Sequence, residues 1–218
     1  MKVLYFMLCL LVILILNISY SQNISTPESF PQNGGTIVLS SPPCKEDFNG
    51  DGKPDLFWRN YANGQNFVWL MDNTQILEYR YPPKLTDLNW IMAGIGDFNT
   101  DGKPDLVWRN YSSGQNSIWY MNGTQCAGYK MLPTVTDPNW VLSGVEDMNQ
   151  DGFPDLIWRY YGTGPFQGMN SIWYLDANAD STGFRIMPTL TDLDWIIAGV
   201  RDFNGDSYPD LLWRNYGT

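Results

Sequence analysis

An acidic pattern recurs four times along the chain, and each copy places oxygen-bearing side chains at alternate positions. The first copy, DFNGDGKPD, begins at Asp47, and the later copies begin at Asp97, Asp147 and Asp202. Carboxylates stand at positions one, five and nine, and an amide stands at position three. Alternate spacing in a tight loop turns such side chains toward one centre, and hard oxygen donors suit Ca²⁺ rather than Zn²⁺. The pattern therefore predicts a calcium site in each copy.

The predicted ligands are the four oxygen-bearing side chains of each copy and the backbone carbonyl of position seven. In chain order these positions are Asp47, Asn49, Asp51, Lys53 and Asp55; Asp97, Asn99, Asp101, Lys103 and Asp105; Asp147, Asn149, Asp151, Phe153 and Asp155; and Asp202, Asn204, Asp206, Tyr208 and Asp210. The copies are not EF-hand loops, because position twelve is Trp instead of Glu and a predicted strand follows. We expect up to four Ca²⁺ ions. The alternative is an Asx-rich turn that holds no metal.

Position six separates the fourth copy from the other three. Gly52, Gly102 and Gly152 stand there in the first three copies, and Ser207 stands there in the fourth. Glycine permits the sharp bend because it adopts positive φ without steric cost. If the position requires positive φ, serine strains the loop by about 1 kcal/mol. The sequence therefore predicts a weaker calcium site in the fourth copy.

Tryptophan follows the same repeat and gives its period. Three sets recur in register, namely Trp58, Trp108, Trp158 and Trp213; Trp69, Trp119 and Trp173; and Trp90, Trp140 and Trp195. Successive members lie about 50 residues apart, and the longer third interval comes mostly from a glycine-rich insertion at Gly162–Gly168. A period of this length is typical of repeat architectures such as propellers.

Within each repeat the sequence predicts four short strands, separated by Gly, Pro, Asn and Asp. In the second repeat these strands are 90–96, 105–110, 116–122 and 126–132. No stretch has a sustained helical period. Four strands in every repeat predict an all-β fold, a β-propeller built of four-stranded blades. Both faces of a propeller blade are covered, so consecutive apolar residues of one strand can all be buried.

The four acidic copies, each followed by D-L-x-W-R, resemble the calcium loops of integrin α-subunit propellers and of FG-GAP and VCBS repeats. The resemblance covers residues 37–218 and implies a propeller that holds calcium between the first two strands of each blade. It also implies a further possibility, because some such propellers are fungal lectins that bind sugars between blades. The last repeat is incomplete, so we expect part of a larger propeller. The approximate units are 37–89, 90–139, 140–194 and 195–218.

Trp and Arg stand at the same register in successive repeats, and we expect mainly structural roles for them. A Trp at one register in every blade is expected to fill the gap between blades, although sugar stacking is an alternative. An Arg follows each Trp of the first set and is expected to reach a carbonyl or an Asp of its own or the next blade. A sulfated or acidic ligand is the alternative for these residues, Arg59, Arg109, Arg159 and Arg214. The unit tails and the insertion at Gly162–Gly168 read as loop material that could carry specificity.

The first 21 residues predict a secretion signal, with a lysine, an apolar run and small residues before a cut after Ser21. A membrane anchor is the alternative, because the apolar run is near the lower limit for a span. Residues 22–36 read as a polar leader without packed structure. No other segment is predicted to cross a membrane.

Secretion would make two kinds of modification available. Asn23, Asn110 and Asn122 lie in N-x-S/T triplets and are candidate glycosylation sites in a eukaryotic host. Cys44 and Cys126 remain after signal removal, and whether they pair in an oxidising compartment stays open.

Composition excludes several function classes. The chain has no His, so it cannot build a Ser-His-Asp, Cys-His or His-ligated zinc site. A net charge of −10 without a basic stripe argues against nucleic-acid binding. The clustered carboxylates are assigned to the acidic copies, which leaves no pair for glycoside hydrolysis.

The sequence therefore predicts a secreted, non-catalytic, calcium-stabilised module that recognises glycans or extracellular proteins. One alternative is a structural or adhesive segment of a larger surface protein. Another is the non-catalytic portion of a polysaccharide-degrading enzyme. We also expect residues 22–218 alone to be poorly soluble or oligomeric, because an open set of blades leaves strand edges bare.

Overall fold

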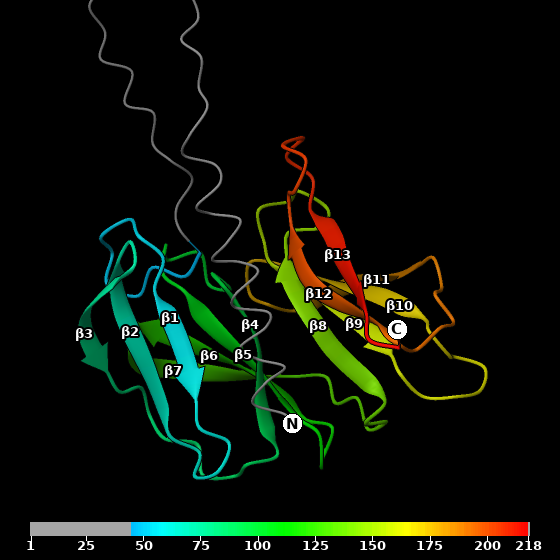
Figure 1. Ribbon diagram of the computed structural model, residues 1–218, viewed down its shortest axis with the longest axis horizontal. Helices are drawn as coiled ribbons and strands as arrows, with labels where there is room; N and C mark the ends of the chain where they lie inside the picture. Colours follow the sequence, from blue (N-terminus) through cyan, green and yellow to red (C-terminus); the bar gives the residue numbers. More distant parts are fainter. Residues whose placement is uncertain (1–44, 218) are drawn as a thin grey trace, which may run out of the picture. The chain divides into compact units, whose positions relative to one another are not determined.

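The computed structural model describes residues 45–217, which form 13 strands and no helix (Figure 1). The strands are β1 (Leu56–Arg59), β2 (Asn66–Asp72), β3 (Gln75–Arg80), β4 (Trp90–Gly96), β5 (Asp105–Asn110), β6 (Asn116–Asn122), β7 (Gln125–Leu132), β8 (Trp140–Glu146), β9 (Asp155–Tyr160), β10 (Asn170–Leu175), β11 (Ser181–Met187), β12 (Trp195–Arg201) and β13 (Asp210–Asn215). In this part of the chain no helix is long and apolar enough to span a membrane.

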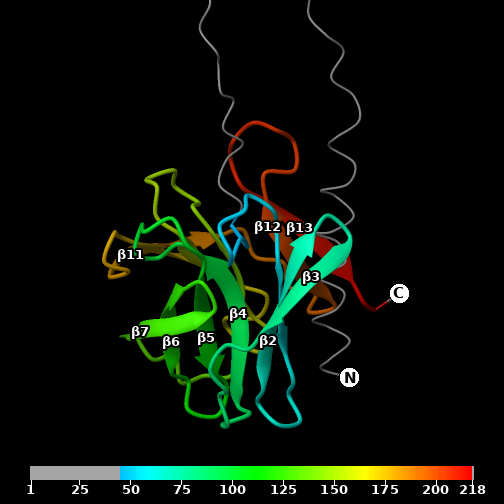
Figure 2. The same cartoon turned by 90° about the vertical axis from the view of Figure 1, so that its left-hand side faces the viewer.

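Consecutive strands pair antiparallel into four sheets, which we term blades 1 to 4. Blades 2 and 3 have four strands each, in the orders β4-β5-β6-β7 and β8-β9-β10-β11. Figure 2 shows the strands of blade 2 following one another from β4 to β7. Within residues 45–217, blade 1 has the three strands β1–β3 and blade 4 has the two strands β12 and β13. The predicted β-propeller of four-stranded blades is confirmed.

The strands of the second repeat lie where the sequence predicts them. β4, β5 and β6 have the predicted bounds, and β7 begins one residue early, at Gln125. Leu106, Val107 and Trp108 are consecutive in β5 and are all fully buried. A strand whose neighbouring side chains are all buried must be covered on both faces, as strands inside a propeller are.

The first strands of neighbouring blades approach closely. β4 lies next to β8, and β8 lies next to β12. Gly94 in β4 permits one approach, because a Cβ there would lie 2.4 Å from a side-chain carbon of Val145 in β8. Gly144 in β8 permits the other approach, because a Cβ there would lie 2.5 Å from a side-chain carbon of Val200 in β12. The glycines of β4 and β8 are therefore a packing requirement between blades.

Apolar residues fill the seams between blades. Val107 and Ile118 of blade 2 share one buried cluster with Leu142, Leu156 and Trp158 of blade 3. In the next seam, Ile157 of blade 3 clusters with Ile197 and Val200 of blade 4. Because each seam is made from two blades, burial of apolar surface is the main force that joins successive repeats.

The structure bears on two of the modification predictions. Asn110 is a poor glycosylation site, because its side chain is 3% exposed and its Nδ2 donates to Asp87 Oδ2 at 2.8 Å. Asn122 is exposed and ends β6. Within residues 45–217 Cys126 forms no disulfide. Its proposed partner Cys44, the site at Asn23, the secretion signal 1–21 and the leader 22–36 lie outside the described residues.

Candidate functional site

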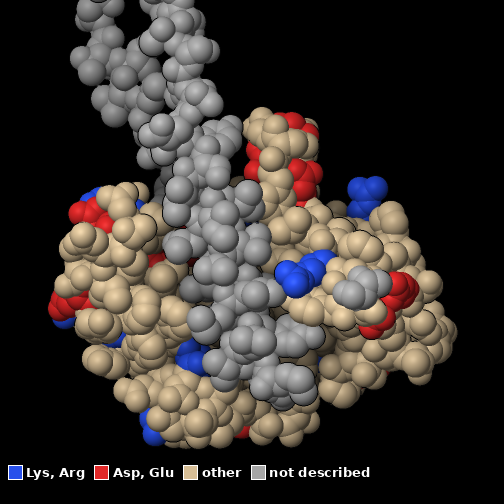
Figure 3. All heavy atoms as spheres, in the orientation of Figure 1, with Lys and Arg blue, Asp and Glu red and all other residues tan. Residues whose placement is uncertain are grey.

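The four acidic copies form loops at corresponding places in the blades. We term them acidic loops 1 to 4, at residues 47–55, 97–105, 147–155 and 202–210. Loops 2, 3 and 4 join the first strand of a blade to its second strand. Loops 3 and 4 touch, because Gln150 Nε2 donates to the carbonyl of Ser207 at 2.8 Å. Figure 3 shows exposed carboxylates on the loop between β12 and β13, at the top of the view.

The carboxylate at position one closes each loop through backbone hydrogen bonds. In loop 1, Asp47 Oδ1 accepts from the N–H of Gly50 at 2.6 Å and of Asp51 at 3.2 Å. Its Oδ2 accepts from the N–H of Gly52 at 2.7 Å. The equivalent bond to position six recurs at 2.8 Å in the other three loops. These are the features of the Asx-rich turn that the sequence left as the alternative.

Positions three and five share the same compact turn. In loop 1, Asn49 Oδ1 accepts from the N–H of Asp51 at 3.0 Å, and Asn49 Nδ2 donates to Asp51 Oδ2 at 3.1 Å. Asp51 Oδ1 in turn accepts from the N–H of Lys53, at position seven, at 2.9 Å. The structure therefore brings the predicted side chains of positions one, three and five together.

Position six adopts positive φ in all four loops. The φ angles are 80° for Gly52, 80° for Gly102 and 91° for Gly152. Ser207 adopts φ 72° in loop 4. The prediction that this position requires positive φ is confirmed, so loop 4 carries a strained serine where the other loops have glycine.

The carboxylate at position nine ties its loop to two strands. In loop 2, Asp105 is fully buried; its Oδ2 accepts from the N–H of Phe98 at 3.0 Å, and its Oδ1 accepts from Met121 of β6 at 2.7 Å. Asp55 and Asp155 make the same pair of bonds. Asp210 accepts from Phe203 at 3.1 Å. Sequence reasoning missed this structural role of position nine.

Burial perturbs the position-nine carboxylates. Desolvation raises the pKa of Asp105 to about 7, against the two N–H bonds that lower it, and Asp101 and Asp97 add a smaller repulsion. Desolvation likewise raises the pKa of Asp155 to about 6. A nearby cation would oppose this effect, because it favours the ionised carboxylate.

The donor chemistry of the loops fits calcium at positions one, three and five, where carboxylate and amide oxygens share one turn. Position nine is engaged by two N–H groups, yet a carboxylate offers about four lone-pair sites. Within residues 45–217 no three acidic side chains gather into a group typical of a metal site. Calcium at these loops therefore stays a prediction.

A buried arginine joins each blade to the next. Arg109 is fully buried, and its guanidinium donates to Asn116 Oδ1 at 3.1 Å and to the carbonyls of Val135 and Asp137 at 3.0 and 3.1 Å. Arg59 and Arg159 make equivalent bonds, and their Nε also donates to the carbonyls of Trp90 and Trp195, where the next blades begin. The predicted reach to carbonyls is thus observed for Arg59, Arg109 and Arg159, which we term the arginine clamps, whereas Arg214 is exposed.

Each clamp also stacks on a tryptophan of the following blade. The guanidinium carbon of Arg59 lies 5.1 Å from the Trp108 ring, and that of Arg109 lies 5.1 Å from the Trp158 ring. The clamp of Arg159 reaches Trp213 at 5.0 Å. A guanidinium over an aromatic face is attracted by the ring quadrupole. The first tryptophan set is therefore used in joining blades, as predicted.

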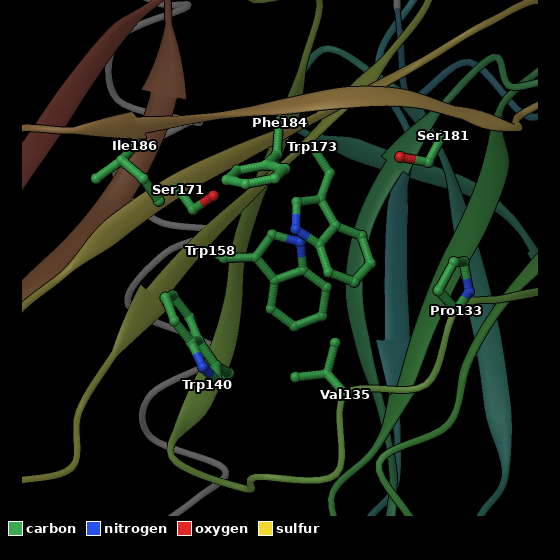
Figure 4. Close-up of a pocket in the computed structure, with 9 residues that line it drawn as sticks. All are labelled: Pro133, Val135, Trp140, Trp158, Ser171, Trp173, Ser181, Phe184 and Ile186. Atoms are coloured by element: carbon green, nitrogen blue, oxygen red, sulfur yellow. The ribbon is translucent and has the colours of Figure 1, made fainter. Parts of the chain in front are cut away.

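Next to one of these seams lies a pocket of about 430 Å³ between blades 2 and 3, which we term the inter-blade pocket (Figure 4). Blade 3 supplies most of its wall, and the segment after β7 supplies the rest. The lining residues are Pro133, Val135, Trp140, Trp158, Ser171, Trp173, Ser181, Phe184 and Ile186. Such a pocket, mostly apolar with a few polar groups, is typical of ligand sites.

The inter-blade pocket contains a buried donor that lacks an acceptor. Trp158 Nε1 is buried and makes no hydrogen bond within residues 45–217, as is also true of Trp58 Nε1 and Trp108 Nε1 at the same register of blades 1 and 2. Figure 4 shows the rings of Trp158 and Trp173 next to each other, and their centroids are 4.9 Å apart. Phe184 is 68% exposed on the outer strand β11 and pairs in register with Trp173. The pocket thus joins an exposed ring to an unsatisfied N–H, and buried donors are normally satisfied.

Comparison with protein families identifies the repeat. The family described as FG-GAP-like repeat matches the chain twice, over residues 47–108 and 97–158. The two matches together span more than half of the 218 residues. The chain belongs to the FG-GAP-like repeat family. A comparison with curated proteins found no match.

Each FG-GAP-like match crosses a blade junction. The first runs from Asp47, which opens loop 1, to Trp108, on which the Arg59 clamp stacks. The second runs from Asp97 to Trp158, which stacks on Arg109. The repeat that the family describes thus contains an acidic loop, an arginine clamp and the tryptophan that receives it.

The FG-GAP-like blades differ at one position that faces the first tryptophan. Ser171 pairs with Trp158 in blade 3 and Ser117 pairs with Trp108 in blade 2, whereas Phe67 pairs with Trp58 in blade 1. The Phe67 ring stacks on Trp58, with centroids 6.0 Å apart and planes 10° apart. A serine leaves room beside the indole that a phenylalanine fills. The exchange sets blade 1 apart, but blades 2 and 3 share the serine, so this position alone does not locate the inter-blade pocket.

Proposed function

We propose that the protein is a secreted, calcium-stabilised, non-catalytic module that binds glycans in the inter-blade pocket. The observation that carries the proposal is the unpartnered N–H of Trp158 in a pocket bordered by the exposed ring of Phe184. A sugar offers an apolar C–H face to a ring and hydroxyl oxygens to a donor, so it matches both features.

Calcium is proposed as a structural ion of the acidic loops. It would be held by the side-chain oxygens of positions one, three and five, and in loop 2 these belong to Asp97, Asn99 and Asp101. When bound, the ion supplies positive charge that offsets the repulsion among the loop carboxylates. The loop side chains already order the backbone, because each position-one carboxylate accepts several N–H groups. The ion therefore stabilises a turn that exists without it.

A binding role without catalysis is supported by how the carboxylates are used. The position-nine aspartates of loops 1 to 3 are buried and accept hydrogen bonds that hold strands, and the position-one aspartates close their loops. The absence of His from the sequence removes the commonest general base. Secretion is supported by the predicted signal at residues 1–21.

A glycan array tests the proposal, with wild-type protein probed in Ca²⁺ and in EDTA. We expect binding to a defined glycan set in Ca²⁺, and Phe184→Ala should weaken it about tenfold. The melting temperature should change little, because Phe184 is exposed and exposed substitutions usually shift stability by less than about 0.5 kcal/mol.

The matched control is Tyr79→Ala, at the corresponding register of β3. Tyr79 is also exposed and pairs with Trp69, but Phe67 occupies the space beside Trp58. This variant should bind like wild type. An array without any bound glycan, or equal losses in both variants, would refute the assignment to the inter-blade pocket. Such a result would favour a structural or adhesive segment.

A further inference from the structure

The turn between β10 and β11 repeats the acidic pattern outside the four acidic loops. Its sequence, DANAD, places Asp176, Asn178 and Asp180 as positions one, three and five. The ninth position is Phe184, where the acidic loops have an aspartate. The turn is therefore a copy of the first half of an acidic loop without the closing carboxylate.

The backbone of this turn follows the acidic loops. Asp176 Oδ1 accepts from the N–H of Asn178 at 2.9 Å and of Asp180 at 3.0 Å. Ala179, at position four, has φ 55°, and position four of loops 2 and 3 has φ 58° and 62° at Thr100 and Gln150. Sequence and conformation thus agree that the turn is built on the same plan.

A cation from the neighbouring blade sits in the turn. Lys130, on β7 of blade 2, donates from Nζ to the carbonyl of Asn178 and to Asp180 Oδ1, both at 2.6 Å. Both bonds are charge-assisted, so they are stronger than neutral hydrogen bonds. The ammonium group therefore links the outermost strand of blade 2 to the outermost hairpin of blade 3.

The residues of this link adjoin, along the chain, two residues that line the inter-blade pocket. Pro133 lines the pocket from the blade 2 side, three residues after Lys130, and Ser181 lines it from the blade 3 side, directly after Asp180. Figure 4 shows Pro133 and Ser181 on the same side of the pocket. The Lys130 contact therefore connects the two walls of the pocket at one side.

We propose that Lys130 is a positioning residue. Its contact latches the turn at 176–180 and so holds the two walls of the inter-blade pocket at the separation that a bound ligand requires. We term this contact the Lys130 latch. This proposal rests on the proposed glycan site and adds the residue that sets the geometry of that site. A latched pocket is pre-organised, so less ordering free energy is lost when ligand binds.

The junction between blades 1 and 2 lacks a corresponding latch. Arg80 has the register of Lys130, because it pairs with Val68 as Lys130 pairs with Ile118. Arg80 instead forms an ion pair with Glu78 of its own strand, at 2.8 Å. Arg80→Met therefore removes an equivalent cation without touching the latch, and it is the matched control for Lys130→Met.

We expect the Lys130 latch to weaken as the salt concentration rises. The side chain of Lys130 is 26% exposed and that of Asp180 is 65% exposed. Exposed ion pairs are screened as ionic strength rises, because the Debye length falls from about 10 Å at 0.1 M to about 3 Å at 1 M. Their free energy corresponds to a factor of about two to five in an equilibrium constant.

Hydrogen–deuterium exchange tests the latch without ligand. We expect Lys130→Met to speed exchange of the Asn178 and Asp180 amides by about two- to fivefold. Salt at 1 M should speed these amides in wild type but not in Lys130→Met. Lys130→Arg should restore slow exchange, and Arg80→Met should leave the turn unchanged. Unchanged exchange in Lys130→Met, or an equal salt response in both proteins, would overturn the latch.

Affinity for the glycan selected on the array tests control of the pocket. Lys130→Met should weaken binding by about two- to fivefold at 0.05 M salt, and the difference from wild type should vanish at 1 M. Equal affinities at low salt, with faster exchange of the turn, would overturn the positioning role. If wild type binds no glycan, the proposed function fails, and the exchange experiment still decides whether the latch exists.

Discussion

The acidic loops carry exposed position-five carboxylates at one end of each blade, whereas the inter-blade pocket is lined by aromatic rings between blades 2 and 3. The loops are alike in all four blades, with the same hydrogen bond from position six to the position-one carboxylate and positive φ at position six. The pocket includes a residue that differs between blades, because Phe184 stands where blades 1 and 2 have Tyr79 and Tyr129. The repeated feature is thus suited to holding the fold, and the variable feature is suited to recognition.

The largest effect should come from the clamp that joins blades. Arg109→Met leaves several buried carbonyls without donors, and we expect it to lower the free energy of unfolding by about 3–5 kcal/mol. Arg214→Met is the control, because Arg214 is exposed and should change stability by less than about 0.5 kcal/mol. Urea unfolding measures both variants. A loss below about 1 kcal/mol for Arg109→Met would show that the arginine clamp does not hold the blades together.

The next effect sharpens the role of calcium at the acidic loops. When the concentration of free Ca²⁺ is 100 times the dissociation constant of a loop, binding raises the free energy of unfolding by about 2.7 kcal/mol. Asp101→Ala should therefore lower the melting temperature clearly in Ca²⁺ and much less in EDTA. Thermal unfolding followed by tryptophan fluorescence measures this difference. Equal losses with and without chelator would refute coordination by Asp101.

Position nine should behave differently from position five. Asp105→Asn keeps one acceptor oxygen but turns an amide group toward the N–H of Phe98 or Met121. We expect a loss of about 1–3 kcal/mol, because a buried N–H is left unsatisfied. The loss should persist in EDTA, since the two hydrogen bonds require no ion. If Asp105→Asn destabilises the protein only in Ca²⁺, the carboxylate at position nine acts mainly as a metal ligand, and its structural role is contradicted.

The smallest effect concerns the strained loop. Ser207→Gly should stabilise the protein by up to about 1 kcal/mol, because glycine adopts the positive φ of position six without strain. Gly102→Ser should destabilise by a similar amount. Chemical denaturation measures the pair. Opposite signs would show that the serine hydroxyl contributes more than its backbone costs.

Much of this fold could be predicted because the repeat is regular. The strands β4, β5 and β6 were predicted to the residue, and the positive φ of position six followed from three glycines. The reach of Arg109 to carbonyls followed from its place after a buried tryptophan. In each case the deciding interactions recur in every blade, so one repeat supports the interpretation of another.

The inter-blade pocket could not be predicted in the same way. It forms where Pro133 of one repeat meets Trp173 and Phe184 of the next, and such a meeting depends on how blades pack. The structural role of Asp105 was also missed, because an aspartate in an acidic loop looks like a ligand whether or not it accepts backbone N–H groups. Trp108 and Trp158 share one register and each lies beneath an arginine clamp, yet Trp158 also lines the inter-blade pocket.

The central claim is that the acidic loops stabilise the fold and the inter-blade pocket binds the ligand. Calorimetric titration of the array-selected glycan into Phe184→Ala and Asp101→Ala, in Ca²⁺ and well below both melting temperatures, tests it most directly. We predict about a tenfold loss of affinity for Phe184→Ala with an unchanged melting temperature, and near wild-type affinity for Asp101→Ala with a lowered melting temperature. Full affinity in Phe184→Ala together with lost binding in Asp101→Ala would contradict the account and place recognition at the acidic loops.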